Sequence, residues 1–223
     1  RQRQMCIRDR DNLETSKDCK RYLKKRNLSD ETIKYFKLGF SSSSKQTLYQ
    51  FLKEQNFEDK ELLESNVVKL DKNNRIRDFF YNRLMFPITN EYGKIVGFGG
   101  RVLDNSNPKY INSPESDFFK KRNILYNLSN AKQTIRSKKN MLICEGYMDV
   151  ISLYDKNIKT AVAPLGTSLT DSHLLLSWKY VNKPTLMFDG DASGLKASFK
   201  SAIMSLPYLT PVSYTHLRAH ETT

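Results

Sequence analysis

The chain has 223 residues, of which 39% are hydrophobic, and 37 Lys and Arg residues outnumber 24 Asp and Glu residues to give a formal net charge of +13. This length fits one large domain or two small ones, and the apolar fraction is sufficient for a packed core, which argues against a disordered chain. The sequence lacks both an apolar stretch of the roughly 18 residues that a membrane span requires and a signal peptide, so we expect a cytoplasmic protein. The positive charge favours a polyanionic partner, although lysines scattered over solvated faces would give the same total.

The three cysteines, Cys6, Cys19 and Cys144, show no C-x-x-C spacing. Neither a structural zinc site nor a disulfide framework is therefore predicted, and a reduced compartment is expected. Because Cys144 ends an apolar run, a buried small side chain is a simpler interpretation of it than a nucleophile.

Both ends of the sequence look foreign to the rest. Residues 1–10, RQRQMCIRDR, show no apolar periodicity, and residues 210–223 contain PVSYTHLRAHETT. Both resemble translated vector or adapter sequence, so we predict non-native extensions. His216 and His220, four residues apart, have the spacing of a metal-binding helix, but a non-native tail is the favoured interpretation.

Residues 18–74 are mainly helical by pattern. Apolar residues recur among lysines and arginines over 18–40, and Ser29-Asp-Glu-Thr32 has the form of a second helix start. Two further helices are predicted over 48–57 and 61–68, and 71–74 is a turn.

Two strands are predicted next, Arg83–Thr89 and 94–103, joined by the turn Asn90-Glu-Tyr-Gly93. Gly97, Gly99 and Gly100 in the second strand indicate bulges, or a backbone that comes close to a ligand or to another part of the protein.

Basic residues recur through this region and just beyond it. Arginine can bind phosphate through two hydrogen bonds, although a surface ion pair explains each basic residue equally well when taken alone. The residues concerned are Arg77, Arg83, Arg101, Lys109, Lys120 and Lys121.

The stretch 141–202 predicts an α/β fold. Three short apolar runs, 141–144, 160–165 and 185–188, read as buried strands, and each is ended by a glycine, a proline or acidic residues. Helical patterns over 147–157 and 173–181 separate them. Strands that alternate with helices form βαβ units, so a parallel sheet is expected.

Acidic residues follow two of these strands. Glu145 comes directly after the first, and Asp189 and Asp191 come after the third. In an open parallel sheet the carboxyl ends of the strands form the ligand-binding edge. Carboxylates gathered there repel each other unless cations lie among them, and hard divalent ions prefer oxygen ligands. The sequence therefore predicts a Mg²⁺ site.

Taken together, EGYMDV, APLGTS and DGDASG resemble the Toprim fold of bacterial DnaG-type primases. Type IA topoisomerases, RecR-like repair proteins and OLD-type nucleases share that fold. The upstream motifs RLMFPI, GFGGRVL, PKYINSPE and LYNL resemble the primase polymerase core and none of those relatives. The resemblance runs from about residue 18 to about residue 207.

The resemblance implies an enzyme that makes short RNA primers on single-stranded DNA from ribonucleoside triphosphates by two-metal nucleotidyl transfer. It implies that Glu145, Asp189 and Asp191 bind Mg²⁺ or Mn²⁺, with Glu145 either a ligand or a general base. Asp149 is either a residue behind the site or a favourable acid at a helix N-terminus. Nucleotide or DNA binding is implied for Arg77, Arg83, Arg101, Lys109 and Lys121.

The resemblance also predicts a mixed α+β basic subdomain over 11–138 and a truncated Toprim subdomain over 139–209. The zinc-binding and helicase-binding domains of full primases lie outside this sequence, so the partner helicase is expected only for the parent protein, in the bacterial replisome. A later D-x-D of the family is absent, and a metal held by fewer carboxylates binds more weakly. Two alternatives stay open: a non-catalytic nucleic-acid-binding fragment, and a Toprim enzyme that cleaves strands.

Overall fold

The computed structural model describes residues 2–42, 46–166 and 168–208. The chain divides into two compact units, one of residues 1–120 with 151–157 and one of residues 121–150 with 158–223. We describe each unit by itself. None of the helices in the described ranges combines the length and the hydrophobicity needed to cross a bilayer.

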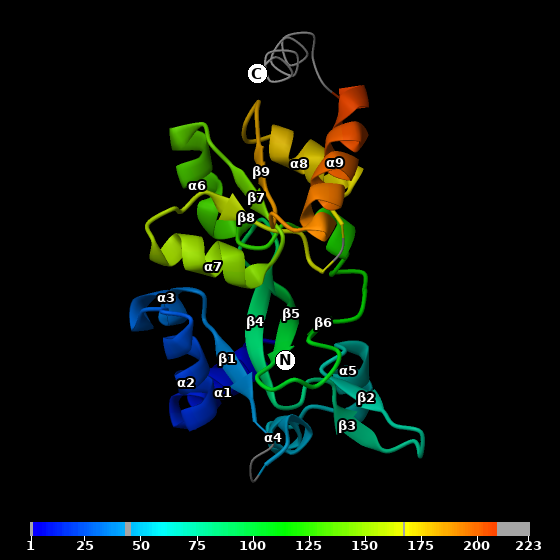
Figure 1. Cartoon of the computed structure of the whole chain (residues 1–223). Coiled ribbons are helices and arrows are strands. Elements are labelled where there is room, and N and C mark those ends of the chain that lie inside the picture. The colour runs from blue at the N-terminus through cyan, green and yellow to red at the C-terminus, as the bar shows by residue number, and fades with distance from the viewer. Residues whose placement is uncertain (1, 43–45, 167, 209–223) are drawn as a thin grey trace. The chain divides into compact units, whose positions relative to one another are not determined.

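The first unit combines helices with antiparallel strands. A four-stranded sheet has the order β1-β4-β5-β6, and a separate hairpin pairs β2 with β3. Its elements are α1 (Gln2–Thr15), α2 (Lys17–Lys25), α3 (Asp30–Tyr35), β1 (Gly39–Ser41), α4 (Leu48–Glu54), α5 (Asp59–Glu64), β2 (Val68–Leu70), β3 (Ile76–Asp78), β4 (Arg83–Thr89), β5 (Ile95–Val102) and β6 (Tyr110–Asn112) (Figure 1).

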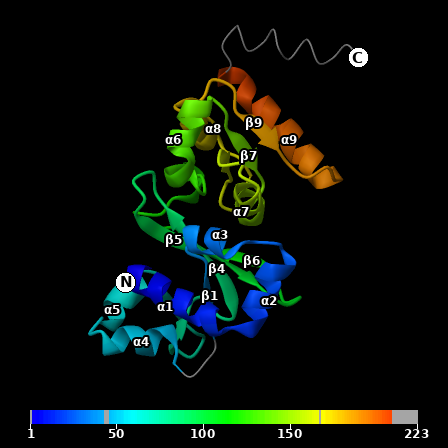
Figure 2. The same cartoon turned by 90° about the vertical axis from the view of Figure 1, so that its left-hand side faces the viewer.

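The second unit is built on a parallel sheet of order β8-β7-β9. Helices α6 and α9 lie on opposite sides of its strands (Figures 1 and 2). Its elements are η1 (Lys121–Asn123), α6 (Leu128–Lys138), β7 (Leu142–Cys144), α7 (Tyr147–Asp155), β8 (Ala161–Val162), α8 (Asp171–Trp178), β9 (Thr185–Met187), α9 (Ala192–Ser205) and η2 (Leu206–Tyr208), with residues 151–155 of α7 assigned to the first unit.

This architecture confirms the predicted α/β class, with an antiparallel subdomain followed by a parallel sheet and helices. The core of the second unit comes from the apolar faces that the sequence indicates: Ile135 of α6, Ile143 of β7 and Val162 of β8 are fully buried. These side chains leave water because α6 packs its apolar face on the sheet, and burial of each such side chain contributes about 1.5–3 kcal/mol.

Two predicted helical stretches run into residues that form strands in the structure. The predicted helix over 61–68 ends at Glu64, and Val68 begins strand β2 instead. Asn66 has φ +55°, which stops the helix, and the β-branched Val67 and Val68 favour an extended chain. Likewise Gly39 and Phe40, predicted within a helical region, pair with β4 as strand β1.

The glycines of β5 permit close packing within the protein. A Cβ on Gly100 would lie 2.7 Å from the Phe80 ring, and one on Gly97 would lie 3.2 Å from the Phe119 ring. Aromatic side chains therefore fill the space beside Gly97 and Gly100. This packing corrects the expectation from the primase resemblance, which favoured a ligand that approaches the strand, and supports the close-packing interpretation.

The structure describes residues 2–10 of the first predicted foreign segment and none of the second, residues 210–223. Residues 2–10 lie in helix α1, whose Met5 and Cys6 are buried in the core with Leu52 and Leu62. The tail with His216 and His220 lies outside the described residues, and the foreign origin of both segments stays a prediction.

Candidate active site

The edge where β7 and β9 end carries the predicted acids, and it brings two of them, Glu145 and Asp189, into contact. The two strands are parallel, and Cys144 is the register partner of Met187. Glu145 leaves β7 directly after Cys144, while Phe188 and then Asp189 leave β9. Because carboxyl ends of parallel strands meet at one edge, residues far apart in the sequence become neighbours there.

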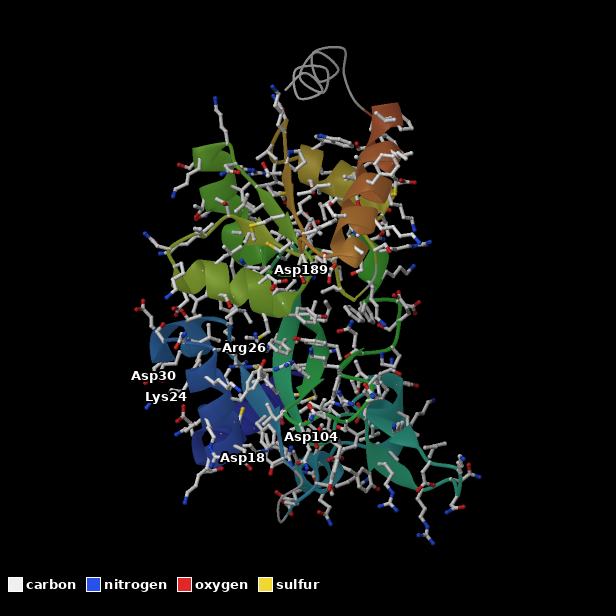
Figure 3. The ribbon with its side chains drawn as sticks, in the orientation of Figure 1. Asp18, Lys24, Arg26, Asp30, Asp104 and Asp189 are labelled. Carbon is white, nitrogen blue, oxygen red and sulfur yellow. The ribbon has the colours of Figure 1, made fainter. Side chains whose placement is uncertain are left out.

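Glu145 and Asp189 are in direct contact. Glu145 Oε1 accepts a hydrogen bond from the backbone N–H of Asp189 at 3.0 Å. Figure 3 labels Asp189, which lies where β9 passes into α9. The carboxylate of Glu145 therefore fixes the start of the loop that carries the two aspartates.

Asp191 is the N-cap of helix α9. Its Oδ1 accepts the backbone N–H of Gly194 at 2.8 Å. This hydrogen bond, together with the bonds from Ser193, lowers the pKa of Asp191 because it stabilises the ionised carboxylate. Asp191 is therefore ionised at neutral pH and also stabilises the helix start.

Gly194 permits this close approach. A Cβ at this position would overlap the carbonyl oxygen of Asp189 and would lie 2.8 Å from its carbonyl carbon and 2.9 Å from Glu145 Oε1. Gly194, the second glycine of DGDASG, is thus required by packing, because any larger residue would push the first turn of α9 away from both acids.

Two neighbours of the site have structural roles. Asp149 Oδ2 accepts the backbone N–H of Gly146 at 3.0 Å, which supports the helix N-terminus interpretation of this acid. Burial raises the pKa of the Cys144 thiol to about 12, so this cysteine stays protonated as a buried small side chain.

The donor chemistry of the edge fits a hard divalent ion. Glu145, Asp189 and Asp191 offer only oxygen atoms, which Mg²⁺ and Mn²⁺ prefer. Within residues 2–42, 46–166 and 168–208, however, no three His, Cys, Asp or Glu side chains are gathered closely enough to hold an ion. The pair Glu145–Asp189 is formed, and the complete ligand set of the prediction is not.

Of the five basic residues predicted to bind nucleotide or DNA, Lys121 belongs to the same compact unit as the three acids. It begins η1, and its side chain is partly buried. The other four, Arg77, Arg83, Arg101 and Lys109, belong to the first unit.

Arg83 and Arg101 are buried, at 8% and 7% exposure. Arg83 Nη1 donates to the carbonyl oxygens of Pro108 at 3.0 Å and Gly100 at 3.3 Å, so it joins β4 to the segment around β6. The Arg101 guanidinium lies over the rings of Tyr22 at 4.4 Å and Tyr110 at 5.6 Å. Arg101 Nε and Nη1 have no hydrogen-bond partner among the described residues.

Arg77 and Lys109 are exposed. Arg77 Nε pairs with Asp71 Oδ2 at 3.2 Å, and its side chain is 60% exposed. An exposed pair of this kind contributes little to stability, so the Arg77 guanidinium can exchange Asp71 for another anion at small cost.

The sequence did not single out the tyrosines that flank Arg101. Tyr22 lies in α2 and Tyr110 in β6, 88 residues apart in the sequence. Aromatic residues in basic segments are the only local signal for such stacking, and that signal does not identify the partner arginine.

A parallel sheet with acids at the ends of neighbouring strands defines a Toprim-type domain, and two family models agree with it. The model described as the DNA primase catalytic core, N-terminal domain, matches residues 9–132, and the Toprim domain model matches residues 139–214. The chain therefore belongs to the family of bacterial DNA primase catalytic cores.

Relatives support this assignment. The DNA primase of Buchnera aphidicola is 37% identical over 206 residues, which cover 92% of this chain and 36% of that protein. The DNA primase of Deinococcus radiodurans is 44% identical over 179 residues, which cover 79% of this chain and 31% of that protein. The chain thus spans about a third of the length of these relatives.

Solved structures show the same fold. The Escherichia coli primase catalytic core superposes with a TM-score of 0.84 at 36% identity and covers 93% of this chain and 67% of that chain. The structure of a DnaG primase catalytic domain bound to ssDNA gives a TM-score of 0.83 at 35% identity and covers 94% of this chain and 68% of that chain.

Proposed function

We propose that this chain is part of a primase that joins ribonucleotides into short RNA primers on a single-stranded DNA template. The observation that carries the proposal is the contact between Glu145 and Asp189 at the sheet edge of a primase-family chain. A relative described as bound to ssDNA supports the choice of template.

Nucleotide joining requires the 3′ hydroxyl of one ribonucleotide to attack the α-phosphate of the next, with pyrophosphate as the leaving group. Glu145, Asp189 and Asp191 would hold Mg²⁺ or Mn²⁺. Such ions, when bound, lower the pKa of the attacking hydroxyl and stabilise charge on the leaving oxygens.

The residues of this chain divide the remaining work. Asp191, ionised and fixed at the start of α9, supplies a preorganised negative charge. Glu145 is either a ligand or the base that accepts the hydroxyl proton, and its bond to Asp189 orients it for either role. Lys121 supplies a cation for the triphosphate in the unit that carries the acids.

The exposed Arg77 and Lys109 are suited to the template backbone, because phosphate contacts are made by accessible cations. Arg101 is buried, so its role in binding would be to hold the rings of Tyr22 and Tyr110 in place by stacking rather than to contact phosphate itself. The replicative helicase stays a predicted partner of the parent protein.

The test is primer synthesis on single-stranded DNA with ribonucleoside triphosphates and Mg²⁺ or Mn²⁺. Glu145→Ala and Asp189→Ala should each abolish synthesis and leave DNA affinity within a few-fold, because neither residue is a cation that contacts phosphate. Glu54→Ala, which removes an exposed acid of α4, is the matched control and should retain synthesis.

A second candidate is a nucleic-acid-binding fragment without catalysis. The observation that favours it is that, among the residues the structure describes, Glu145 and Asp189 are in contact but no cluster of three ligating side chains forms. DNA binding with no synthesis by the unsubstituted chain would select this candidate. Cleavage of the template strand in the same assay would select the strand-cutting class.

A further inference from the structure

The N-terminal turn of α8 binds the backbone of η1. Thr170, the N-cap of α8, donates from its hydroxyl to the carbonyl oxygen of Arg122 at 3.0 Å. His173 Nε2 lies 2.9 Å from the carbonyl oxygen of Lys121. Two consecutive carbonyl groups of η1 are therefore held by two side chains from one helix start.

The hydrogen bonds of His173 determine its tautomer. The backbone N–H of Thr170 donates to Nδ1 at 3.3 Å, so Nδ1 is the acceptor and Nε2 carries the proton that it donates to Lys121. The side chain is fully buried, and burial lowers its pKa, so the ring is neutral at pH 7. Both ring nitrogens then have a partner.

This use of a capping box is unusual. The third residue of such a box is commonly Glu or Gln, which reaches back only to the N-cap backbone. His173 makes that bond with Nδ1 and uses its second nitrogen to hold a segment 52 residues away. The cap of α8 would be complete without the second contact, so helix capping alone does not explain it.

The segment that follows Lys121 is fixed to the sheet as well. The Tyr126 N–H donates to the carbonyl oxygen of Ala163 at 2.7 Å, and Asn127 Nδ2 donates to that of Ala161 at 3.0 Å. The backbone from Lys121 to Asn127 is thus anchored at both ends within the unit that carries Glu145 and Asp189.

We propose that His173 and Thr170 are positioning residues, which hold the Lys121 backbone so that its ammonium group meets the triphosphate of the incoming nucleotide. The inference rests on the proposed function, in which Lys121 binds that triphosphate. A lysine side chain has four rotatable bonds, and a fixed Cα removes the additional freedom of the backbone, which binding would otherwise have to restrict.

The test measures binding of ATP with Mg²⁺ to the whole chain by titration calorimetry. Lys121→Ala should weaken ATP binding about 10-fold, and His173→Leu about 3- to 10-fold, the loss expected for one buried hydrogen bond. In the Lys121→Ala background, His173→Leu should have no further effect. His173→Gln, whose amide can replace both hydrogen bonds, should bind within about twofold of the unsubstituted chain.

Leu174→Ala is the matched control for stability. Leu174 is buried on the same helix turn and belongs to the core of this unit, so its truncation should lower the melting temperature by removing apolar packing. ATP affinity should stay within about twofold in this variant. If His173→Leu does not fold, Thr170→Val gives the same test, because it removes the bond to the Arg122 carbonyl.

Three results would overturn the inference. Equal loss of affinity from His173→Leu with and without the Lys121 side chain would show that His173 does not act through Lys121. Equal loss from Leu174→Ala would show a general effect of stability. Unchanged ATP binding in Lys121→Ala would remove Lys121 from the proposed site, whereas the Glu145 and Asp189 assignment would still be decided by primer synthesis.

Discussion

Glu145 and Asp189, 44 residues apart, are joined by a hydrogen bond from the Asp189 backbone N–H to Glu145 Oε1 at 3.0 Å. A side chain on one strand end therefore sets the backbone of the neighbouring strand end. This contact makes the position of the two aspartates depend on Glu145. Substitutions at these acids should therefore have non-additive effects on the site.

Gly194→Ala should be destabilising, although glycine to alanine in a helix normally stabilises by about 1 kcal/mol. The new Cβ would overlap the Asp189 carbonyl and press on Glu145. We expect a lower melting temperature and about 10-fold weaker Mn²⁺ binding, measured by thermal unfolding and calorimetric titration. Ser198→Ala in the same helix is the control, and a rise in stability for Gly194→Ala would contradict the packing argument.

Asp155→Asn should lower stability at neutral pH. Asp155 Oδ1 accepts three hydrogen bonds, from Ser29 N–H at 2.9 Å, Ser29 Oγ at 2.6 Å and Thr32 Oγ1 at 2.8 Å. The bonds from Ser29 are the main cause that lowers the pKa of Asp155 to about 2.

Because the folded-state pKa is depressed, the contribution of Asp155 is present above about pH 4 and is lost as the pH falls toward 2. The melting temperatures of Asp155→Asn and the unsubstituted chain should therefore differ at pH 7 and converge near pH 2. Asp30→Asn, an exposed acid in the first turn of α3, is the control. A constant difference across this pH range would contradict the assignment.

Asp9→Asn should reduce the pH dependence of stability between pH 4 and 8. Burial raises the pKa of Asp9 to about 8, against the opposing effect of Arg8, whose Nη1 lies 3.3 Å from Asp9 Oδ1. A raised folded-state pKa gives stability that is complete below the unfolded pKa and is lost as the pH rises through about 8.

The unsubstituted chain should therefore lose up to about 1.4 kcal/mol of unfolding free energy per pH unit in this window from Asp9. Urea unfolding at pH 5, 6, 7 and 8 measures the slope, and Asp11→Asn, an exposed neighbour, is the control. Identical slopes for Asp9→Asn and the unsubstituted chain would show that Asp9 is not buried in solution.

Arg83→Met should lower the stability of the fold, whereas Arg77→Ala should weaken DNA binding. Arg83→Met removes the hydrogen bonds that Arg83 donates to the carbonyl oxygens of Gly100 and Pro108, which should cost about 1–3 kcal/mol of unfolding free energy. Arg77→Ala should leave stability unchanged, weaken binding to single-stranded DNA and reduce the salt slope by about 1. Denaturant unfolding measures the first effect, and a salt-dependent DNA titration measures the second. Unchanged stability in Arg83→Met, or unchanged DNA affinity in Arg77→Ala, would contradict these assignments.

The sequence was sufficient to predict strands and turns where the residues within the segment itself mark its two ends. Apolar runs ended by glycine and acids predicted β7 and β9, and the turn at Asn90–Gly93 predicted the β4–β5 hairpin. It failed at β1 and β2 because each lies at the end of a stretch whose apolar residues have helical spacing, so the predicted helix was extended over the strand. The pairing of β1 with β4, more than 40 residues away, decides its conformation.

For the site, the sequence by itself predicted that Glu145 and Asp189 lie at one edge of the sheet, because neighbouring parallel strands end at the same edge. Only the tertiary structure decided how they meet: the Glu145–Asp189 bond, the need for Gly194, the burial of Arg83 and Arg101, and the hold of His173 on Lys121. Each of these joins residues distant in the chain, and sequence patterns report the preference of a segment for its own conformation, not the partner that packing brings to it.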